Sequence, residues 1–200
     1  ERFGDAPALI ASGGGVLSFR ELAARSDAFG RALGRERGLL LVEARNEVAA
    51  VVAYLGALRA RHPVMLVAPD KAEMTRSIIE AYRPSRTYRR VGSGWDLQAA
   101  APERVPVHGD LAVLLSTSGS TGSRKFVRLS YGNVDANAGS IAEYLGIDGT
   151  HVAITALPVS YSYGLSVVNS HLARGAAVVL TESSVVDEDF WTLVREHGVT

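Results

Sequence analysis

Residues 116–125 form a run of small and hydroxyl-bearing side chains that ends on a lysine, Ser-Thr-Ser-Gly-Ser-Thr-Gly-Ser-Arg-Lys. Glycines permit turns that aim successive N–H groups at one point, and small side chains let that backbone approach an anion closely. The hydroxyl groups add donors, and Lys125 adds a positive charge. This run, the glycine loop, is therefore predicted to bind phosphate oxygens. The P-loop signature GxxxxGK[ST] is absent, because Gly119, Gly122 and Lys125 stand three residues apart.

The alternative interpretation of the glycine loop is a flexible linker rich in glycine and serine. An unbroken apolar segment, 111–115, precedes it, and an alternating segment, 125–129, follows it. We predict a buried strand for the first and a return strand for the second. A linker does not normally lie between two strands, whereas ligands of open α/β sheets bind beyond the carboxyl ends of strands. The position therefore favours phosphate binding.

A second candidate site is the segment 157–165, Leu-Pro-Val-Ser-Tyr-Ser-Tyr-Gly-Leu. It is predicted to join a strand, which Pro158 ends, to a helix. Tyr161, Tyr163 and Gly164 could line a ligand pocket. The segment would lie at the same sheet edge as the glycine loop if the two preceding strands run parallel. The alternative is a structural turn rich in tyrosine.

Metal-binding residue types show no ligand spacing. None of the five histidines stands four residues from another histidine or from a helical carboxylate in the pattern of a zinc site, and cysteine is absent. The acidic run 187–189 is typical of a helix start, where negative charge suits the macrodipole. We therefore predict no metal ligand in this sequence.

The elements that must position these residues alternate along the chain. A hairpin is predicted over 7–19. Further strands are predicted at 39–42, 64–67, 87–91, 111–115, 125–129, 152–157 and 176–180, and helices at 19–33, after Asn46, and at 70–82, 134–145, 165–174 and 187–197. Apolar strands separated by helices predict an α/β fold, a layered and mainly parallel sheet flanked by helices.

Polar residues mark several of the predicted helix starts. Ser18 with Glu21, and Asp70 with Glu73, have the spacing of a capping box. Asn46 can cap the helix that follows it.

One segment stands out as a break in the pattern. The loop-like residues 92–109 are the best candidate for an internal boundary. The arginines of the strand just before it, 87–91, suggest the edge of a sheet.

Composition sets the broad class. The chain has 200 residues, 47% of them hydrophobic, and a formal net charge of zero, so nothing indicates binding to nucleic acid or to an anionic membrane. No apolar run is long enough to span a bilayer, and no signal peptide opens the chain. We expect a cytoplasmic protein. The sequence begins without methionine and ends where another strand is expected to start, so we expect a fragment of a longer chain.

The glycine loop resembles the phosphate-loop signature of the adenylate-forming, or AMP-binding, superfamily, whose usual form is T-S-G-S/T-T-G-x-P-K-G. That superfamily comprises acyl- and aryl-CoA synthetases, adenylation domains of nonribosomal peptide synthetases, and beetle luciferases. Arg124 replaces the usual proline and Phe126 the final glycine, whereas the core 117–122 and Lys125 are intact. The segment 157–165 is similar to the family's L-P-x-x-H-x-x-G-L, with Tyr161 at the histidine position. Residues 5–10, 18–22 and 55–64 add further similarity, so the resemblance covers nearly the whole chain.

The resemblance implies a two-step ligation that needs ATP and Mg²⁺. A carboxylic acid is activated to an acyl-adenylate, and the acyl group then passes to a thiol of CoA or of a carrier-protein pantetheine arm. The phosphates would be held by Thr117, Ser118, Gly119, Ser120, Thr121, Gly122 and Lys125, with Lys125 as the catalytic residue. The acyl pocket would include Tyr161, Tyr163 and Gly164.

The resemblance also implies that other parts of the site are not in this sequence. The family's adenine-binding aromatic residue, metal-binding glutamate, ribose-binding aspartate and C-terminal catalytic lysine belong to motifs that do not occur here. We expect the first part of the large N-terminal domain, with the small C-terminal domain absent, and a chain that is inactive by itself. The alternative is a non-catalytic nucleotide-binding module or degenerate homologue, and a phosphotransferase is a weaker third reading. Because 159–163 contains no acid to anchor an amino group, an acyl or aryl acid is favoured over an α-amino acid.

Overall fold

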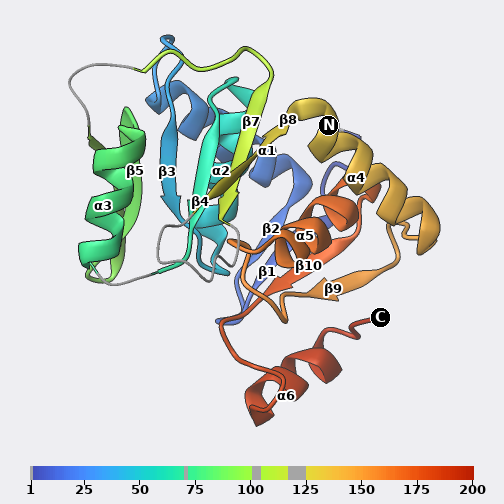
Figure 1. The fold of residues 1–200 in the computed structure, drawn as a ribbon. Helices are drawn as coiled ribbons and strands as arrows, with labels where there is room; N and C mark the ends of the chain where they lie inside the picture. The colour runs from blue at the N-terminus through green and yellow to red at the C-terminus, as the bar shows by residue number, and fades with distance from the viewer. Residues whose placement is uncertain (1, 70–71, 101–104, 117–124) are drawn as a thin grey trace. The chain divides into compact units, whose positions relative to one another are not determined.

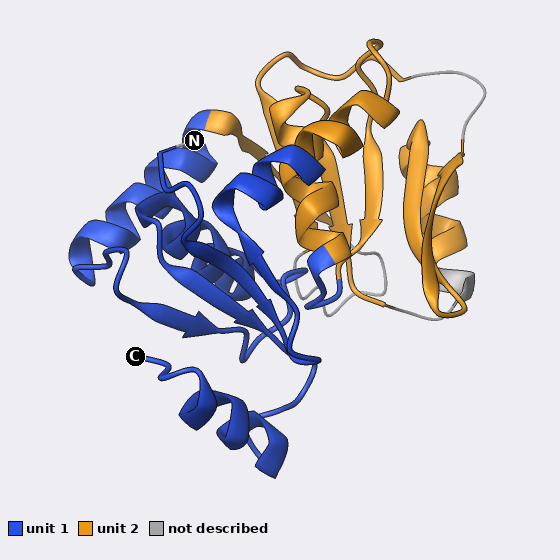
Figure 2. Cartoon of the chain, turned by 180° about the vertical axis from the view of Figure 1, so that it is seen from behind, with its two compact units in different colours: residues 1–25, 45–48, 132–200 blue, residues 26–44, 49–131 orange. Residues whose placement is uncertain are grey.

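A computed structural model describes residues 2–69, 72–100, 105–116 and 125–200. The chain forms two compact units (Figure 2). Unit 1 comprises residues 1–25, 45–48 and 132–200, and unit 2 comprises residues 26–44 and 49–131. Among the residues described, no helix combines the length and apolar character that crossing a membrane requires.

Unit 2 contains a six-stranded sheet in the order β6-β5-β3-β4-β7-β8 (Figure 1). Its strands are β3 (Leu40–Glu43), β4 (Val64–Val67), β5 (Arg86–Val91), β6 (Gly94–Ala99), β7 (Leu111–Ser116) and β8 (Phe126–Ser130). The inner four run parallel, and β6 and β8 pair antiparallel at the two edges. The central strands carry no polar alternation because both of their faces are buried.

Helices complete unit 2. Helix α2 (Val48–Arg59) lies almost wholly within it, and α3 (Ala72–Tyr82) packs Ile78, Ile79 and Tyr82 onto one face of the sheet, against Leu41 and Met65. This apolar contact holds α3 as a layer on the sheet, as the alternation of helices and strands along the sequence predicts.

Unit 1 contains a four-stranded sheet in the order β2-β1-β10-β9. Its strands are β1 (Pro7–Ala11), β2 (Val16–Ser18), β9 (Val152–Ile154) and β10 (Ala177–Leu180). Its helices are α4 (Tyr131–Tyr144), α5 (Ser162–Arg174) and α6 (Glu188–Glu196), and α1 (Phe19–Ala32) begins in it. Leu193 of α6 packs against Ile10 and Val179 on one face of the sheet, and α5 contacts β9 and β10. The α/β class with mainly parallel pairing is therefore confirmed.

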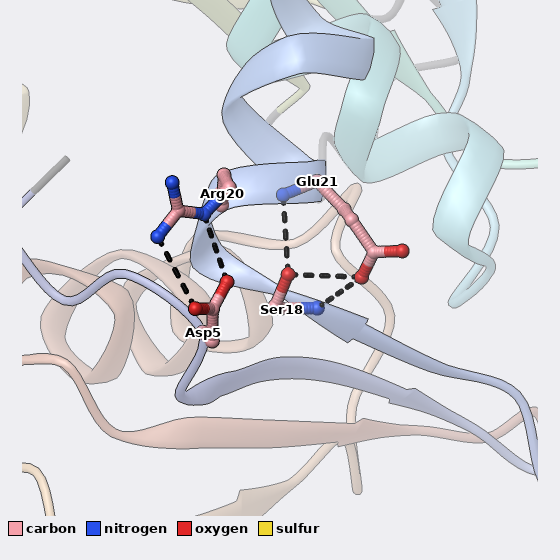
Figure 3. Close-up of polar contacts among 4 residues, drawn as sticks. All are labelled: Asp5, Ser18, Arg20 and Glu21. Atoms are coloured by element: carbon pink, nitrogen blue, oxygen red, sulfur yellow. Dashed lines mark hydrogen bonds and ion pairs between the residues drawn. The ribbon is translucent and has the colours of Figure 1, made fainter.

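Helix α1 begins with the predicted capping box (Figure 3). The Ser18 hydroxyl accepts from the Glu21 amide at 3.2 Å, and the Glu21 carboxylate accepts from the Ser18 amide at 2.8 Å. The amide of Ser18, and then its hydroxyl, lower the pKa of Glu21. Beside this cap, Arg20 pairs with Asp5 at 2.8 Å. The second predicted capping box, at Asp70, lies outside the described residues.

The prediction of a loop throughout 92–109 is wrong at residues 94–99, which form β6. Gly92, with φ of +59°, makes the turn that lets β6 fold back along β5. The rings of Tyr88 and Trp95 stack across the pair at 5.0 Å. As a result β5 is the second strand of the sheet rather than its edge, because β6 pairs along its outer side. The two units divide at 25/26, 44/45, 48/49 and 131/132.

The expectation that both candidate segments follow strands of one sheet is also wrong. Strand β7, before the glycine loop, pairs with β4 and β8 in unit 2. Strand β9, before the segment 157–165, pairs with β10 in unit 1. Both strands are apolar, and the hydrophobic pattern of a strand does not say which sheet it joins. Three boundaries also shift, because β9 already ends at Ile154, α4 begins at Tyr131 and α5 begins at Ser162.

Candidate functional site

The glycine loop connects the two strands of a hairpin at one edge of the six-stranded sheet. Ser116, the last residue of β7, stands opposite Phe126, the first of β8, in an antiparallel register. Because β7 runs parallel to β4, the loop begins at the carboxyl edge of the parallel strands. That is the edge at which open α/β sheets bind ligands. The predicted phosphate-binding residues Thr117, Ser118, Gly119, Ser120, Thr121 and Gly122 lie outside the described residues.

Lys125 is the one residue of the predicted phosphate site that the structure describes. It directly precedes β8 and is exposed. The next residue, Phe126, turns its ring onto Tyr82 of α3 at 5.0 Å in an edge-on arrangement and joins the apolar core of unit 2. The aromatic residue at the position where the family has glycine thus anchors the end of the loop beside Lys125.

Arg37 supports the start of the strand that carries the loop, and sequence reasoning missed it. Its guanidinium donates to four backbone carbonyls, those of Arg61 at 2.6 Å, Val107 at 3.3 Å, His108 at 2.7 Å and Leu111 at 2.8 Å. The planar group thereby holds the turn after α2, the segment before β7 and the first residue of β7 together. An arginine followed by a glycine gives no sequence signal of such a role.

The segment 157–164 of unit 1 is a tight turn onto the first turn of α5. The Tyr161 amide donates to the Pro158 carbonyl at 2.9 Å. Gly164 lies directly on the backbone of this turn, since an added Cβ would collide with the Pro158 carbonyl oxygen and lie 2.6 Å from that of Leu157. Only glycine allows this approach. Tyr161 and Tyr163 remain 52% and 63% exposed.

Two of the three predicted substrate residues line a cavity of about 540 Å³ in unit 1. Tyr163 and Gly164 contribute to its wall together with His151 and His171. Burial lowers the pKa of His171, although the Val167 carbonyl 2.8 Å from its Nδ1 acts in the opposite direction. A neutral imidazole suits a wall made mostly of apolar side chains. Tyr161 is not among the lining residues.

Asn46 reaches the same turn from a distant part of the sequence. Its side-chain oxygen accepts from the Val159 amide at 3.0 Å, and its side-chain nitrogen donates to the Thr181 carbonyl at 2.9 Å. The prediction that Asn46 caps the following helix is therefore wrong, because the side-chain oxygen that a cap would use binds Val159. Helix α2 begins only at Val48.

Within the described ranges, no group of three or more histidine, cysteine, aspartate or glutamate side chains could hold a metal ion. Among the described residues, Lys125 contributes a positive charge at the end of the glycine loop.

The fold and the loop position define a class of α/β protein whose ligand site follows the carboxyl end of a parallel strand. The model of the family described as AMP-binding enzyme matches residues 69–200. The chain belongs to this family, which confirms the resemblance to adenylate-forming enzymes.

Two curated proteins are similar in sequence to part of this chain. A 2-succinylbenzoate–CoA ligase of Bacillus velezensis is 34% identical over 99 residues, which are 50% of this chain and 20% of that protein. A salicylyl-CoA synthase/salicylate adenylyltransferase of a Streptomyces species is 32% identical over 80 residues, 39% of this chain and 14% of that protein.

Solved structures share the fold. The o-succinylbenzoate coenzyme A synthetase of Bacillus subtilis, in complex with AMP, has a TM-score of 0.80 at 23% identity. The match covers 98% of this chain and 57% of that one, so the chain spans little more than half the length of this structural relative. The mainly parallel α/β layers are thus those of the N-terminal domain of adenylate-forming enzymes.

Proposed function

We propose that this chain is the first part of the large domain of an AMP-forming acid–thiol ligase. The observation that carries this is the family match over 69–200, which includes the whole glycine loop and the segment 157–165. In the proposed reaction a carboxylate oxygen attacks the α-phosphorus of ATP, and the bond from that phosphorus to the bridging oxygen breaks to release pyrophosphate. A thiol sulfur then attacks the acyl carbon, loses its proton, and displaces AMP.

The residues at the glycine loop fit a bound triphosphate. The hairpin register fixes both ends of the loop at the carboxyl edge of the sheet, and Lys125 brings an exposed cation to one end. In the proposed site, loop amides and the hydroxyls of 117–121 donate to the β- and γ-phosphates. Such preorganised donors stabilise the charge of the departing pyrophosphate. The AMP complex of the structural relative supports a nucleotide ligand.

Magnesium would supply further neutralisation of phosphate charge when bound. The described residues offer no cluster of ligands for it. In the proposal its protein ligand, like the groups that bind adenine and ribose, lies in a part of the enzyme beyond these 200 residues. No step above is assigned to a metal ligand of this chain.

The proposed acid is an acyl or aryl acid rather than an α-amino acid. The two curated relatives are named for succinylbenzoate and salicylate, which are both aryl acids. The turn 159–163 carries no carboxylate that could pair with a substrate ammonium group. The thiol acceptor is proposed to be CoA or a carrier-protein pantetheine, and the CoA-dependent names of both relatives support the first.

The test is acid-dependent pyrophosphate release by the full-length protein, measured with a panel of aryl, aliphatic and α-amino acids. We expect release that requires ATP and Mg²⁺ and is fastest with an aryl or aliphatic acid. Best activity with an α-amino acid would overturn the substrate class alone. Nucleotide binding without release for any acid would favour the non-catalytic module instead.

A further inference from the structure

Asn46 lies in a four-residue segment of unit 1 that interrupts the sequence of unit 2. Residues 45–48 group with 132–200 by their contacts, whereas their neighbours on both sides belong to unit 2. Asn46 is only 7% exposed. A buried side-chain amide is costly unless its donors and its acceptor are all satisfied.

All of the hydrogen-bonding groups of the Asn46 amide are used within unit 1. The oxygen accepts from the Val159 amide at 3.0 Å, and the nitrogen donates to the carbonyls of Thr181 at 2.9 Å and Leu157 at 3.4 Å. The Asn46 backbone amide donates to the Glu182 carboxylate at 2.6 Å, which holds the side chain in place. The amide therefore joins the end of β10 to the turn that precedes α5.

The two bonds to the turn reproduce a backbone pairing. Binding the carbonyl of Leu157 and the amide of Val159 is the pattern that a neighbouring parallel strand would make on either side of Pro158. Strand β9 has already ended at Ile154, and proline has no amide to contribute. The Asn46 side chain thus supplies the two hydrogen bonds that a neighbouring strand would make to Leu157 and Val159. These bonds fix the direction of the chain at Pro158.

The same turn is held on its other side by the close approach of Gly164 to the carbonyls of Leu157 and Pro158. Tyr161 and Tyr163 of the same segment have exposed side chains, and Tyr163 lines the cavity of about 540 Å³. A backbone clamped between Asn46 and α5 gives these side chains a fixed origin. If the backbone of the turn were mobile, each binding event would have to order it, at a cost in conformational entropy.

We propose that Asn46 is a positioning residue that holds the turn 157–163 for the carboxylic acid substrate. The role of the turn in acid binding rests on the function proposed above, whereas the clamp itself does not. Asn46 touches no reacting atom in this proposal. It acts through the backbone of Leu157 and Val159, so its loss is expected to weaken acid binding and to leave ATP binding unchanged.

The clamp is tested by hydrogen–deuterium exchange on the full-length protein. Asn46→Ala is expected to speed exchange of the Val159 amide by about tenfold or more, since that amide loses its acceptor. Asn46→Asp keeps an acceptor oxygen but loses both donors, so the Val159 amide should stay protected. Asn137→Ala, on the exposed surface of α4, is the matched control. Unchanged Val159 exchange in a folded Asn46→Ala variant would overturn the clamp. If the alanine variant does not fold, loss of Val159 protection in Asn46→Asp would overturn it instead.

The effect on the substrate is tested by steady-state pyrophosphate release. Both Asn46 variants should raise KM for the acid by about fivefold to tenfold, the effect of losing one or two hydrogen bonds to the turn, with KM for ATP unchanged. In a Tyr163→Ala background the further effect of Asn46→Ala should be smaller, because the two act through one turn. Equal changes in both KM values, or full additivity, would overturn the positioning role. Absence of acid-dependent release in the parent would reject the proposed function, while the exchange experiment would still decide the clamp.

Discussion

At the scale of single residues, Lys125 is the charge that the proposed chemistry needs. It is exposed at the end of the glycine loop, beside the ring of Phe126 that packs on Tyr82. Lys125→Ala in the full-length protein should slow adenylate formation by about a hundredfold to a thousandfold, because it removes a donor to the phosphates that leave in that step. Thiol transfer from a supplied acyl-adenylate should change far less. Rapid-quench measurement of the two half-reactions separates these effects.

The matched control for Lys125 is Arg128→Ala, which removes an exposed cation from the same strand, β8. It should leave both half-reactions near the parent rate. An adenylation rate in Lys125→Ala equal to that of the parent would return the glycine loop to the linker interpretation.

Asp148 gives a residue-scale prediction about pH. The hydroxyl of Thr150, then its amide, and then His151 bind the carboxylate and lower its pKa from 3.8 to about 2. A folded-state pKa below the unfolded value means that the stabilisation is complete above about pH 4 and is lost as the pH falls towards about 2. Asp148→Asn should therefore unfold at lower urea than the parent at about pH 6, and the difference should shrink at about pH 2.5.

A difference between Asp148→Asn and the parent that stays constant across this pH range would contradict the assignment. Asp135→Asn, in the exposed surface of α4, controls for the loss of one negative charge.

At the scale of elements, the close contact of α5 with the turn before it depends on Gly164 having no side chain. Gly164→Ala should destabilise the protein by about 1–3 kcal/mol, because the new Cβ collides with the Pro158 carbonyl and the turn must move. The same substitution at Gly139, where no atom lies within 4 Å of the added Cβ, should stabilise α4 by about 0.5–1 kcal/mol. Urea unfolding of both variants measures the contrast, and a neutral Gly164→Ala would show that the turn tolerates a side chain.

The elements also show how strands are held from outside the sheet. Arg37 ties the turn after α2 and the segment before β7 to the first residue of β7, and Asn46 ties the residue after β10 to the turn before α5. In both cases a polar side chain from a loop binds backbone groups of segments that lie far from it in the sequence.

At the scale of the whole molecule, the 200-residue chain is expected not to form adenylate by itself. In the proposed enzyme the groups that bind adenine, ribose and the metal lie beyond it, and electrostatic stabilisation of the departing pyrophosphate would be incomplete. ATP–pyrophosphate exchange on the isolated chain, with the best acid found for the full-length protein, should stay at background. Clear acid-dependent exchange would contradict this distribution of the site.

Local patterns in the sequence were sufficient for most of the elements and for the family. An apolar run such as 64–67 or 111–115 reports burial directly, and the spacing of Ser18 and Glu21 specifies a helix start through contacts within four residues. The glycine loop was recognisable because its small residues and lysine stand together in the chain. All of these signals depend on neighbours in sequence, so they can be read without the fold.

Tertiary structure alone decided how these pieces combine. The strands before the two candidate segments, β7 and β9, are equally apolar, yet they join different sheets because sheet membership depends on pairing between strands far apart in sequence. Strand β6 emerged from a loop-like stretch because β5 offered it a partner. Asn46 is of a residue type that often caps helices, yet its side chain binds a turn more than a hundred residues away. The reason is that a buried amide binds the backbone groups that folding brings to it.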